Sequence, residues 1–464
     1  MVLLSKFKTV PTSCVEYVHP WTQSCTNATT CLSAACIQES LRIYVTVYIL
    51  ALIMRGKVPS RQDVKKTLLA ILQSSLFLTC NGTAFPLFTC LLRNILGNFN
   101  VLTVSFIPAA LASYMAILLE RPSRRGLLSL YVTNVASETL FRMATWRGLV
   151  RPVPHGEVAI FAVSVATLLY CYRSRHAPRD SIYSLFRFIV GPFEEHGYGE
   201  NREDLPSQHR MHVVSPAESR AGGPARPSVG AFSLALNAYK NLIQHIKSYG
   251  RHAACPHPFS CTSYVLQGTV KLFSLGYGLQ ACLRLLLQMR RVVRRPSILP
   301  RLLFHKNALK LGAFLGGLSG TFRLVSCLLR WTRNKDSKFH AIPAGLLAGL
   351  SFAFFPDNTI ALYVMWKSLQ IIYNTGVERG YLPEVSGFTI LLYTVSTAIL
   401  FHAAILEPHN LRPSYWKFLF SISGGRISTM DRKSLDAFGL ESSRGLLEMA
   451  HKTKTPLLPI SYFE

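Results

Sequence analysis

Apolar runs about as long as the ~20 residues that a helix needs to cross a bilayer recur along this 464-residue chain. Eight of them predict membrane-spanning helices, and they fall into two sets of four. The first set is Leu68–Leu92, Val101–Leu119, Gly126–Thr145 and Glu157–Tyr172, and the second set is Ala308–Leu329, Phe339–Phe355, Thr359–Tyr373 and Phe388–Leu406. This pattern predicts an all-α multi-pass membrane protein built from two four-helix units.

Two weaker apolar runs precede these sets. Leu41–Met54 is short, and Val265–Met289 is interrupted by Lys271, Arg284 and Gln288. A helix with one apolar and one polar face lies along the membrane surface instead of crossing it. We therefore expect an amphipathic interfacial helix ahead of each four-helix unit.

These runs divide the chain into six expected segments. They are a cysteine-rich N-terminal segment with its amphipathic helix (1–66), a first transmembrane unit (67–190), a flexible linker (191–250), a second Cys/His segment with its amphipathic helix (251–306), a second transmembrane unit (307–414) and a polar C-terminal tail (415–464). The linker is rich in Gly, Pro, Ser, Glu and Arg and has few aromatic residues, a composition typical of chain that buries no core.

Short motifs of the first unit recur in the second unit in the same order. Gly82–Arg93 reads GTAFPLFTCLLR and Gly320–Arg330 reads GTFRLVSCLLR, which matches Cys90 with Cys327. The later matched pairs are Pro108 with Pro343 and Tyr131 with Tyr363, and the separation within a pair shortens slightly from each pair to the next. A slowly shrinking offset is typical of one duplication followed by small deletions. We infer that the two units are copies of one ancestral unit.

Charge supports the membrane interpretation and sets the expected orientation. The chain has 50 Lys and Arg against 23 Asp and Glu, a net charge of +27, yet charged residues make up only 16% of it. Such an excess suits nucleic acid or an anionic membrane surface. Because no zinc finger, RNA-recognition signature or heptad-bearing basic region is present, we expect membrane lipids, through their anionic headgroups, as partners and no nucleic acid.

Basic loops follow both weaker apolar runs, and the positive-inside rule places such loops in the cytosol. Four spans per unit put both loops, the linker and both termini on that side, whereas five spans per unit would separate the loops. We therefore predict four plus four spans. This arrangement leaves the basic stretch from Arg330 to Lys338 on the opposite side of the membrane.

Cysteine and histidine cluster ahead of each unit. The candidate ligands are Cys14, His19 and Cys25 in the first group and Cys255, His257 and Cys261 in the second group. Thiolates and imidazoles suit zinc, although these spacings are not the short ones that usually mark a zinc site. Two interpretations stay open, namely zinc ligands and unliganded or palmitoylated cysteines near the membrane. No other cofactor is expected.

Ionisable residues inside predicted spans are costly and therefore candidates for function. Glu138 and Arg142 lie four residues apart on one helix face, and Lys367 and Gln370 lie on the corresponding helix of the second unit. We predict either a Glu138–Lys367 pair between the units or a local Glu138–Arg142 pair. Since no nucleophile elbow, HExxH motif or phosphate-binding loop is present, we predict that the protein is not an enzyme.

A glycine ladder, Gly312, Gly316 and Gly320, occupies the first helix of the second unit, and small residues four apart let helices approach closely in lipid. The residues that continue the pattern are Phe322, Arg333, Asp336, Ala344, Gly345 and Gly349. Their order resembles the signature of the mitochondrial inner-membrane translocase superfamily, whose members are four-span proteins. The acidic residue stands one position early, since that family expects it at Ser337.

Blocks spread over about residues 10–440 carry a closer resemblance. They include ESLRIY (39–44), RRGLL (124–128), ETLFRM (138–143), LGAFLG (311–316), LRPSYWKFL (411–419) and MDRKSLDAFG (430–439). The chain resembles the transmembrane protein 135 family, also called the peroxisomal membrane protein 52 family. The resemblance implies a multi-pass protein of peroxisomal and mitochondrial membranes. It also implies roles in mitochondrial fission–fusion balance, peroxisome organisation and lipid metabolism, with a dynamin-related fission GTPase as a partner.

Two functions follow from these features. The first is a membrane-embedded scaffold that presents a surface to cytosolic partners. The second is a conduit for lipid or a small solute between the two repeated units, because internal repeats with polar groups near the midplane are common in transporters.

Overall fold

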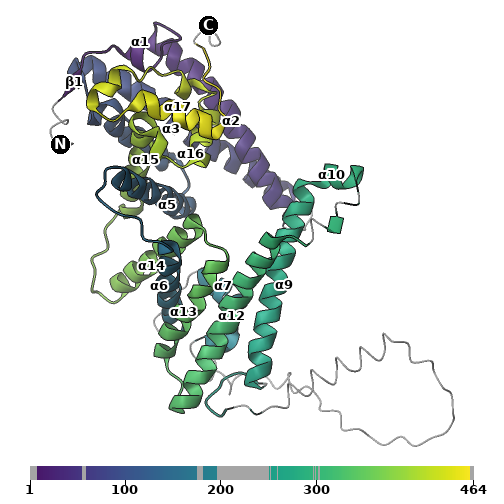
Figure 1. Cartoon of the computed structure of the whole chain (residues 1–464). Helices are drawn as coiled ribbons and strands as arrows, with labels where there is room; N and C mark the ends of the chain where they lie inside the picture. The colour runs from purple at the N-terminus through teal and green to yellow at the C-terminus, as the bar shows by residue number, and fades with distance from the viewer. Residues whose placement is uncertain are drawn as a thin grey trace, which may run out of the picture. The chain divides into compact units, whose positions relative to one another are not determined.

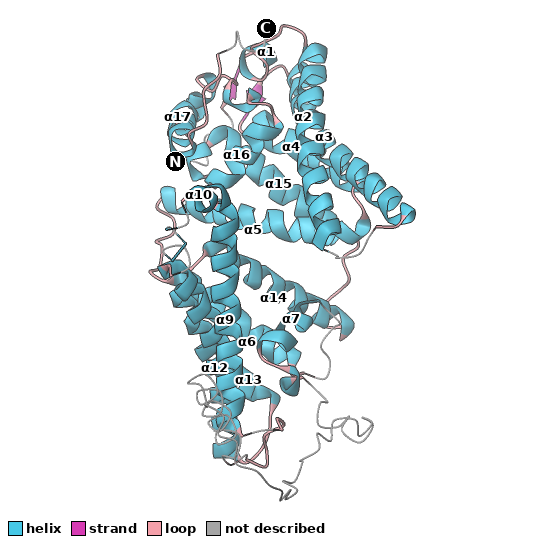
Figure 2. Ribbon diagram, turned by 90° about the vertical axis from the view of Figure 1, so that its right-hand side faces the viewer, coloured by secondary structure: helices cyan, strands magenta, loops and turns pink. Residues whose placement is uncertain are grey.

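The apolar runs of both predicted sets form helices in the computed structural model. It describes residues 8–54, 59–174, 181–195, 250, 252–258, 260–295, 297, 299–300 and 304–459. Helices make up nearly all of the regular structure in these ranges (Figure 2). Within them, one ribbon pairs β1 (Thr9–Val10) antiparallel to β2 (Phe99–Asn100). The prediction of an all-α multi-pass membrane protein is confirmed.

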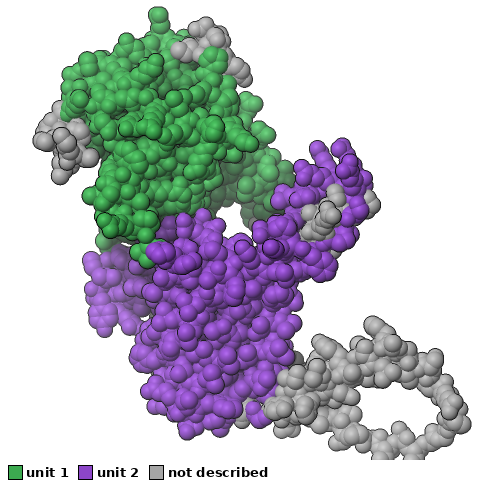
Figure 3. Space-filling view, in the orientation of Figure 1, with its two compact units in different colours: residues 1–153, 384–464 green, residues 154–383 purple. Residues whose placement is uncertain are grey.

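The helices form two compact units, residues 1–153 with 384–464 and residues 154–383 (Figure 3). Unit 1 contains α1 (Cys14–Tyr17), α2 (Cys25–Met54), α3 (Arg61–Leu96), η2 (Leu102–Phe106), α4 (Ile107–Leu119), α5 (Pro122–Trp146), α15 (Phe388–Leu406), η8 (Pro408–Asn410), α16 (Pro413–Ile422), η9 (Arg426–Ser428), η10 (Ser434–Phe438) and α17 (Ser442–Thr453). Unit 2 contains α6 (Gly156–Tyr172), α7 (Ser181–Ile189), η3 (Pro192–Glu194), α9 (Cys261–Leu287), α10 (Met289–Arg294), α12 (Lys306–Arg333), η6 (Lys338–His340), α13 (Ala341–Gly349), η7 (Leu350–Phe354) and α14 (Asn358–Glu378).

The order of the long helices agrees with a duplicated chain, but the compact units do not follow the two copies. The matched cysteines lie in α3 and α12, the matched prolines in α4 and α13, and the matched tyrosines in α5 and α14. The last predicted span of each set lies in the compact unit that holds most of the other set. α6 packs against α13 and α14 in unit 2, and α15 packs against α4 and α5 in unit 1 (Figure 1). Neither compact unit therefore coincides with the predicted unit 67–190 or 307–414.

Glycines create the closest helix contacts of unit 2. Gly312, Gly316 and Gly320 lie where α12 meets α9, and a Cβ atom added at Gly316 would stand 2.9 Å from the Cβ of Phe273. Gly276 on α9 faces back, and its added Cβ would stand 2.8 Å from the carbonyl oxygen of Leu311. The two backbones thus approach closely enough for van der Waals attraction to hold the hairpin in lipid.

Helix α6 is held by the same chemistry. A Cβ added at Gly345 would lie 2.6 Å from the Cα of Ala166, and one added at Gly349 would lie 2.4 Å from the Cα of Ala162. Ala344 beside them is fully buried. The small residues of the translocase-like signature therefore form the surface of α13 on which α6 packs.

Helices α2 and α9 differ from the interfacial helices that we expected. They contain 30 and 27 residues. Among the described residues, six helical segments are long and apolar enough to cross a membrane: α2, α3, η2 with α4, α9, α12 and α15. Exposed apolar side chains, such as Ile37 and Leu50 on α2 and Val270 and Leu279 on α9, are suited to lipid contact. The apolar runs of these two helices look weak in the sequence because polar residues start both helices and charged residues interrupt the second.

The remaining predicted spans are helical but do not meet the same criteria. The runs Gly126–Thr145 and Thr359–Tyr373 form most of α5 and α14, which are not among the six. The helices Gly156–Tyr172 and Lys338–Phe354 are apolar but shorter. At about 1.5 Å per residue, a 17-residue helix extends about 26 Å, less than the ~30 Å of a bilayer core.

If α2 crosses the bilayer, the two ends of this helix lie on opposite sides of the membrane. We expect protease protection on isolated organelles to place an N-terminal tag and a tag between α2 and α3 in different compartments. At about 1.5 Å per residue, α2 extends about 45 Å, which exceeds the bilayer core. Finding both tags in one compartment would restore the interfacial helix and the predicted cytosolic N-terminus.

The C-terminal segment folds onto unit 1 and is not a free polar tail. Trp416 and Leu435 are fully buried, and the Trp416 indole donates to the hydroxyl of Thr455. The buried Arg432 donates to the backbone carbonyls of Ala404 and Ile427. In the predicted linker, Pro192–Glu194 packs in unit 2, whereas residues 196–249 lie outside the described residues.

Candidate metal centres

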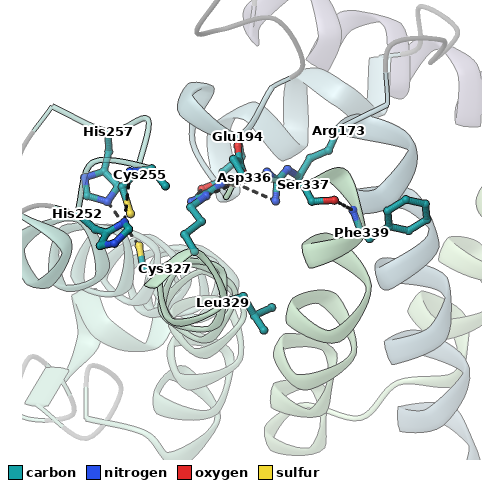
Figure 4. A network of polar contacts seen from close by, with 12 residues as sticks. Arg173, Glu194, His252, Cys255, His257, Cys327, Leu329, Asp336, Ser337 and Phe339 are labelled. Atoms are coloured by element: carbon teal, nitrogen blue, oxygen red, sulfur yellow. Dashed lines mark hydrogen bonds and ion pairs between the residues drawn. The ribbon is translucent and has the colours of Figure 1, made fainter. Parts of the chain in front are cut away.

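Four metal-ligating side chains converge in unit 2. Cys255, His257, Cys261 and Cys327 each place one ligand atom within 4.8 Å of the others. The Cys255 and Cys261 sulfurs are 3.7 Å apart, and the Cys327 sulfur lies 3.5 Å from Nε2 of His257 (Figure 4). His257 and Cys255 are buried. Three of these residues are predicted candidates, and Cys327 on α12 completes the set.

Unit 1 contains the same arrangement. Cys14, His19, Cys25 and Cys90 also place their ligand atoms within 4.8 Å of one another. The Cys14 and Cys25 sulfurs are 3.6 Å apart, and none of the chain's cysteines forms a disulfide. Here too the three predicted residues are joined by a fourth, Cys90, which lies on α3.

Neither fourth ligand was predicted from the sequence, although the sequence carries a signal for both. Cys90 and Cys327 are the matched cysteines of the repeated CLLR motif. The motif indicates a duplication, but it does not indicate a place in either cysteine group, because each of these two cysteines lies far along the chain from the other candidates. Only the antiparallel return of α3 along α2, and of α12 along α9, brings it back to them.

Local structure holds the first cluster in place. Cys14 begins α1, whose first turn is closed by a capping box between Ser13 and Glu16, and Cys25 begins α2. One turn after Cys90, the Arg93 guanidinium donates to the carbonyl oxygens of Pro11 and Thr12. The arginine of CLLR thus anchors the segment that carries Cys14.

The ring of His19 is prearranged as a ligand. Its Nδ1 lies 2.9 Å from the carbonyl oxygen of Thr22, so Nδ1–H donates and the lone pair resides on Nε2. His19 is 1% exposed, and its Nε2 has no hydrogen-bond partner among the described residues. A buried ring nitrogen of this kind is costly unless something binds it.

The thiols of the two clusters differ in acidity. Hydrogen bonds from Cys327, His257 and Cys261 stabilise the thiolate of Cys255 and lower its pKa to about 4, against the opposing effect of burial. Burial, followed by the neighbouring Cys25, raises the pKa of Cys14. Thiolate is the form in which cysteine binds metals.

A buried ion-pair network adjoins the unit 2 cluster (Figure 4). Arg330, one turn after Cys327, is fully buried and donates to both carboxylate oxygens of Glu194, at 3.0 and 2.6 Å. It also donates to Asp336 at 2.9 Å, and Arg173 contacts both acids. Despite its burial, Glu194 has a lowered pKa because Arg330 and Arg173 stabilise its charge.

On α12, the arginine of this network is not the arginine of the translocase-like signature. Arg333, the arginine of that pattern, is exposed, and the paired arginine is Arg330. Asp336, which stands one position early in that pattern, accepts from both Arg330 and Arg173. Phe322 of the same signature is buried in the core of unit 2.

The four polar candidates on α5 and α14 each contact another candidate on the same helix. Glu138 accepts from Arg142 on its own helix and from Arg412, which precedes α16. Lys367 donates to Gln370 on α14 at 3.0 Å. The local Glu138–Arg142 pair is confirmed. The Glu138–Lys367 pair stays a prediction.

One family model covers the part of the chain that contains the first cluster. Residues 11–145 match the family model described as the N-terminal cysteine-rich region of Transmembrane protein 135. All four ligand candidates of unit 1 lie within the matched residues. No solved structure matches the chain.

Proposed function

Because residues 11–145 identify the chain as a member of the transmembrane protein 135 family, we propose that it acts as a scaffold in peroxisomal and mitochondrial membranes. Its proposed task is to regulate mitochondrial fission–fusion balance, peroxisome organisation and lipid metabolism by presenting a surface to cytosolic partners. A dynamin-related fission GTPase is the proposed partner. The family resemblance supports these roles, and the six apolar helices support the multi-pass location.

The observation that carries the scaffold proposal is that the buried acids are held in fixed pairs. Among the described residues, the buried glutamates all lie within ion-pair distance of an arginine; they are Glu120, Glu138, Glu194 and Glu407. A path for protons or ions needs charged groups that face water or exchange partners. Fixed pairs instead hold helices in one arrangement, as a scaffold requires.

Exposed basic residues at one end of each long hairpin support anionic lipids as partners. The first turns of α3 contain Arg61, Lys65 and Lys66. The short helix α10 contains Arg290, Arg291 and Arg294, and Arg295 follows it. Each basic side chain near an anionic leaflet contributes about 1 kcal/mol of attraction. We propose that these turns lie at the cytosolic headgroups and set the orientation of the chain.

An apolar pocket in unit 1 favours a second candidate function, a lipid conduit. Most of its lining is apolar and includes Leu32, Phe85, Phe401 and Leu419. This lining suits a hydrocarbon chain better than an ion or a polar solute. The conduit proposal is therefore limited to lipid.

Reconstitution distinguishes the two functions. We expect the purified full chain in liposomes to move neither a fluorescent phospholipid nor a small polar dye, while the same liposomes recruit the fission GTPase from solution. Liposomes without the chain and liposomes with an unrelated multi-pass protein serve as controls. Lipid movement without any partner would replace the scaffold by the conduit. An absence of recruitment together with an absence of flux would contradict both.

A further inference from the structure

Three ligand–ligand distances in the two cysteine–histidine clusters match those of a tetrahedral metal site. Zn–S bonds of about 2.3 Å and Zn–N bonds of about 2.05 Å require S···S edges of about 3.8 Å and S···N edges of about 3.6 Å. The sulfurs of Cys14 and Cys25 are 3.6 Å apart, those of Cys255 and Cys261 are 3.7 Å apart, and Cys327 is 3.5 Å from the His257 ring nitrogen. Each measured edge thus lies close to its tetrahedral value.

We propose that each cluster binds one Zn²⁺ through three cysteine thiolates and one histidine. The unit 1 ligands are Cys14, His19, Cys25 and Cys90, and the unit 2 ligands are Cys255, His257, Cys261 and Cys327. Two independent observations carry the assignment. A set of three cysteine sulfurs and one histidine nitrogen converges twice, on separate parts of the chain. The buried Nε2 of His19 lacks a hydrogen-bond partner among the described residues, while its Nδ1 donates to a carbonyl.

Other uses of the cysteines fit this geometry less well. A disulfide needs sulfurs about 2.05 Å apart, and all of the cysteines are unpaired thiols. Palmitoylation needs accessible thiols, whereas Cys255 and Cys327 are 3% and 4% exposed. An iron–sulfur cluster would hold its ligands around several atoms, and ligand atoms within 4.8 Å of one another enclose a single ion.

Both sites are structural because all four coordination positions are supplied by the protein. In unit 1 the ion would join the N-terminal segment to the starts of α1 and α2 and to the last turns of α3. In unit 2 it would join residues 255–257 to the start of α9 and to the last turns of α12. Each long helical hairpin, α2 with α3 and α9 with α12, has its basic turn at one end. The ion would join the two helices at the other end of the hairpin.

Metal content of the full chain tests the assignment. We expect the protein, purified in detergent without a polyhistidine tag, to contain two zinc ions per chain when measured by inductively coupled plasma mass spectrometry. Cys90→Ser and Cys327→Ser should each lower the content to one, and the double variant should contain none. Cys31→Ser and Cys282→Ser are matched controls, since these exposed cysteines lie on α2 and α9 outside the clusters, and both should keep two.

Two further measurements separate metal loss from misfolding. His19→Cys preserves four ligands and should keep two zinc ions per chain, whereas His19→Ala should lower the content to one. Co²⁺ taken up by the wild-type chain should show the intense visible bands of tetrahedral thiolate ligation. The proposal is overturned if folded wild-type protein contains no zinc. It is also overturned if iron replaces zinc at the same stoichiometry, or if the cysteine variants keep two zinc ions.

Discussion

Replacing Arg330 with methionine is expected to destabilise unit 2 by about 3–5 kcal/mol, the usual cost of leaving a buried charge without its partner. Arg330 and Glu194 are both fully shielded from solvent, and the guanidinium donates to both oxygens of that carboxylate. Methionine preserves much of the side-chain volume but supplies no donor. The loss can be measured as a shift in the unfolding of detergent-solubilised protein with increasing denaturant.

Arg333→Met is the matched control for this experiment. Arg333 follows Arg330 by about one turn on the same helix, and it is exposed, so its replacement should change stability by no more than about 0.5 kcal/mol. Adding Glu194→Gln to Arg330→Met removes the unpaired charge and should recover part of the loss. Equal effects of Arg330→Met and Arg333→Met would contradict the assignment of Arg330 as the paired arginine.

Replacing Gly276 with leucine is expected to separate α9 from α12 and to destabilise unit 2 by about 1–3 kcal/mol or more. An added Cβ at this position meets backbone atoms, the Leu311 carbonyl oxygen at 2.8 Å and the Gly312 Cα at 3.1 Å. Backbone atoms within a helix cannot move aside as a flexible side chain does. The hairpin must therefore open, which proteolysis and thermal unfolding of the solubilised protein would detect.

Gly278→Leu is a stringent control because it makes the same change at a nearby position of the same helix. Nothing lies within 4 Å of an added Cβ at Gly278, so leucine there should be tolerated and would extend the lipid-facing surface. A comparable loss in both variants would mean that glycine is needed for the helix itself. In that case the close approach of α9 and α12 would not explain the effect.

Local sequence patterns account for much of the fold. Apolar runs predict the positions of α3, α4, α5, α6, α12, α13, α14 and α15 to within seven residues at either end, because helix formation depends on neighbours in sequence. The same patterns failed where a polar start hides a long helix. α2 begins at Cys25, well before the apolar run that starts at Leu41. The first turns of this helix contain Ser, Thr and Asn, so hydrophobicity alone does not indicate them.

The signature arginine illustrates how sequence spacing can mislead. Arg330 and Arg333 lie one turn apart near the end of α12, and a motif comparison favours Arg333. Burial decides otherwise, because Arg330 points toward Glu194 on the short helix Pro192–Glu194. Glu194 itself fell at the edge of a predicted linker, where no pattern indicates a packed charge.

The amino-acid order alone specified most of the helices, the repeated motifs and three members of each cysteine–histidine cluster, since all of these are recorded in short windows. Folding in three dimensions settled the placement of α6 and α15, the recruitment of Cys90 and Cys327, and the choice of Arg330 as the paired cation. These features depend on contacts between residues far apart along the chain, or on which helix faces meet. Local periodicity carries no information about either.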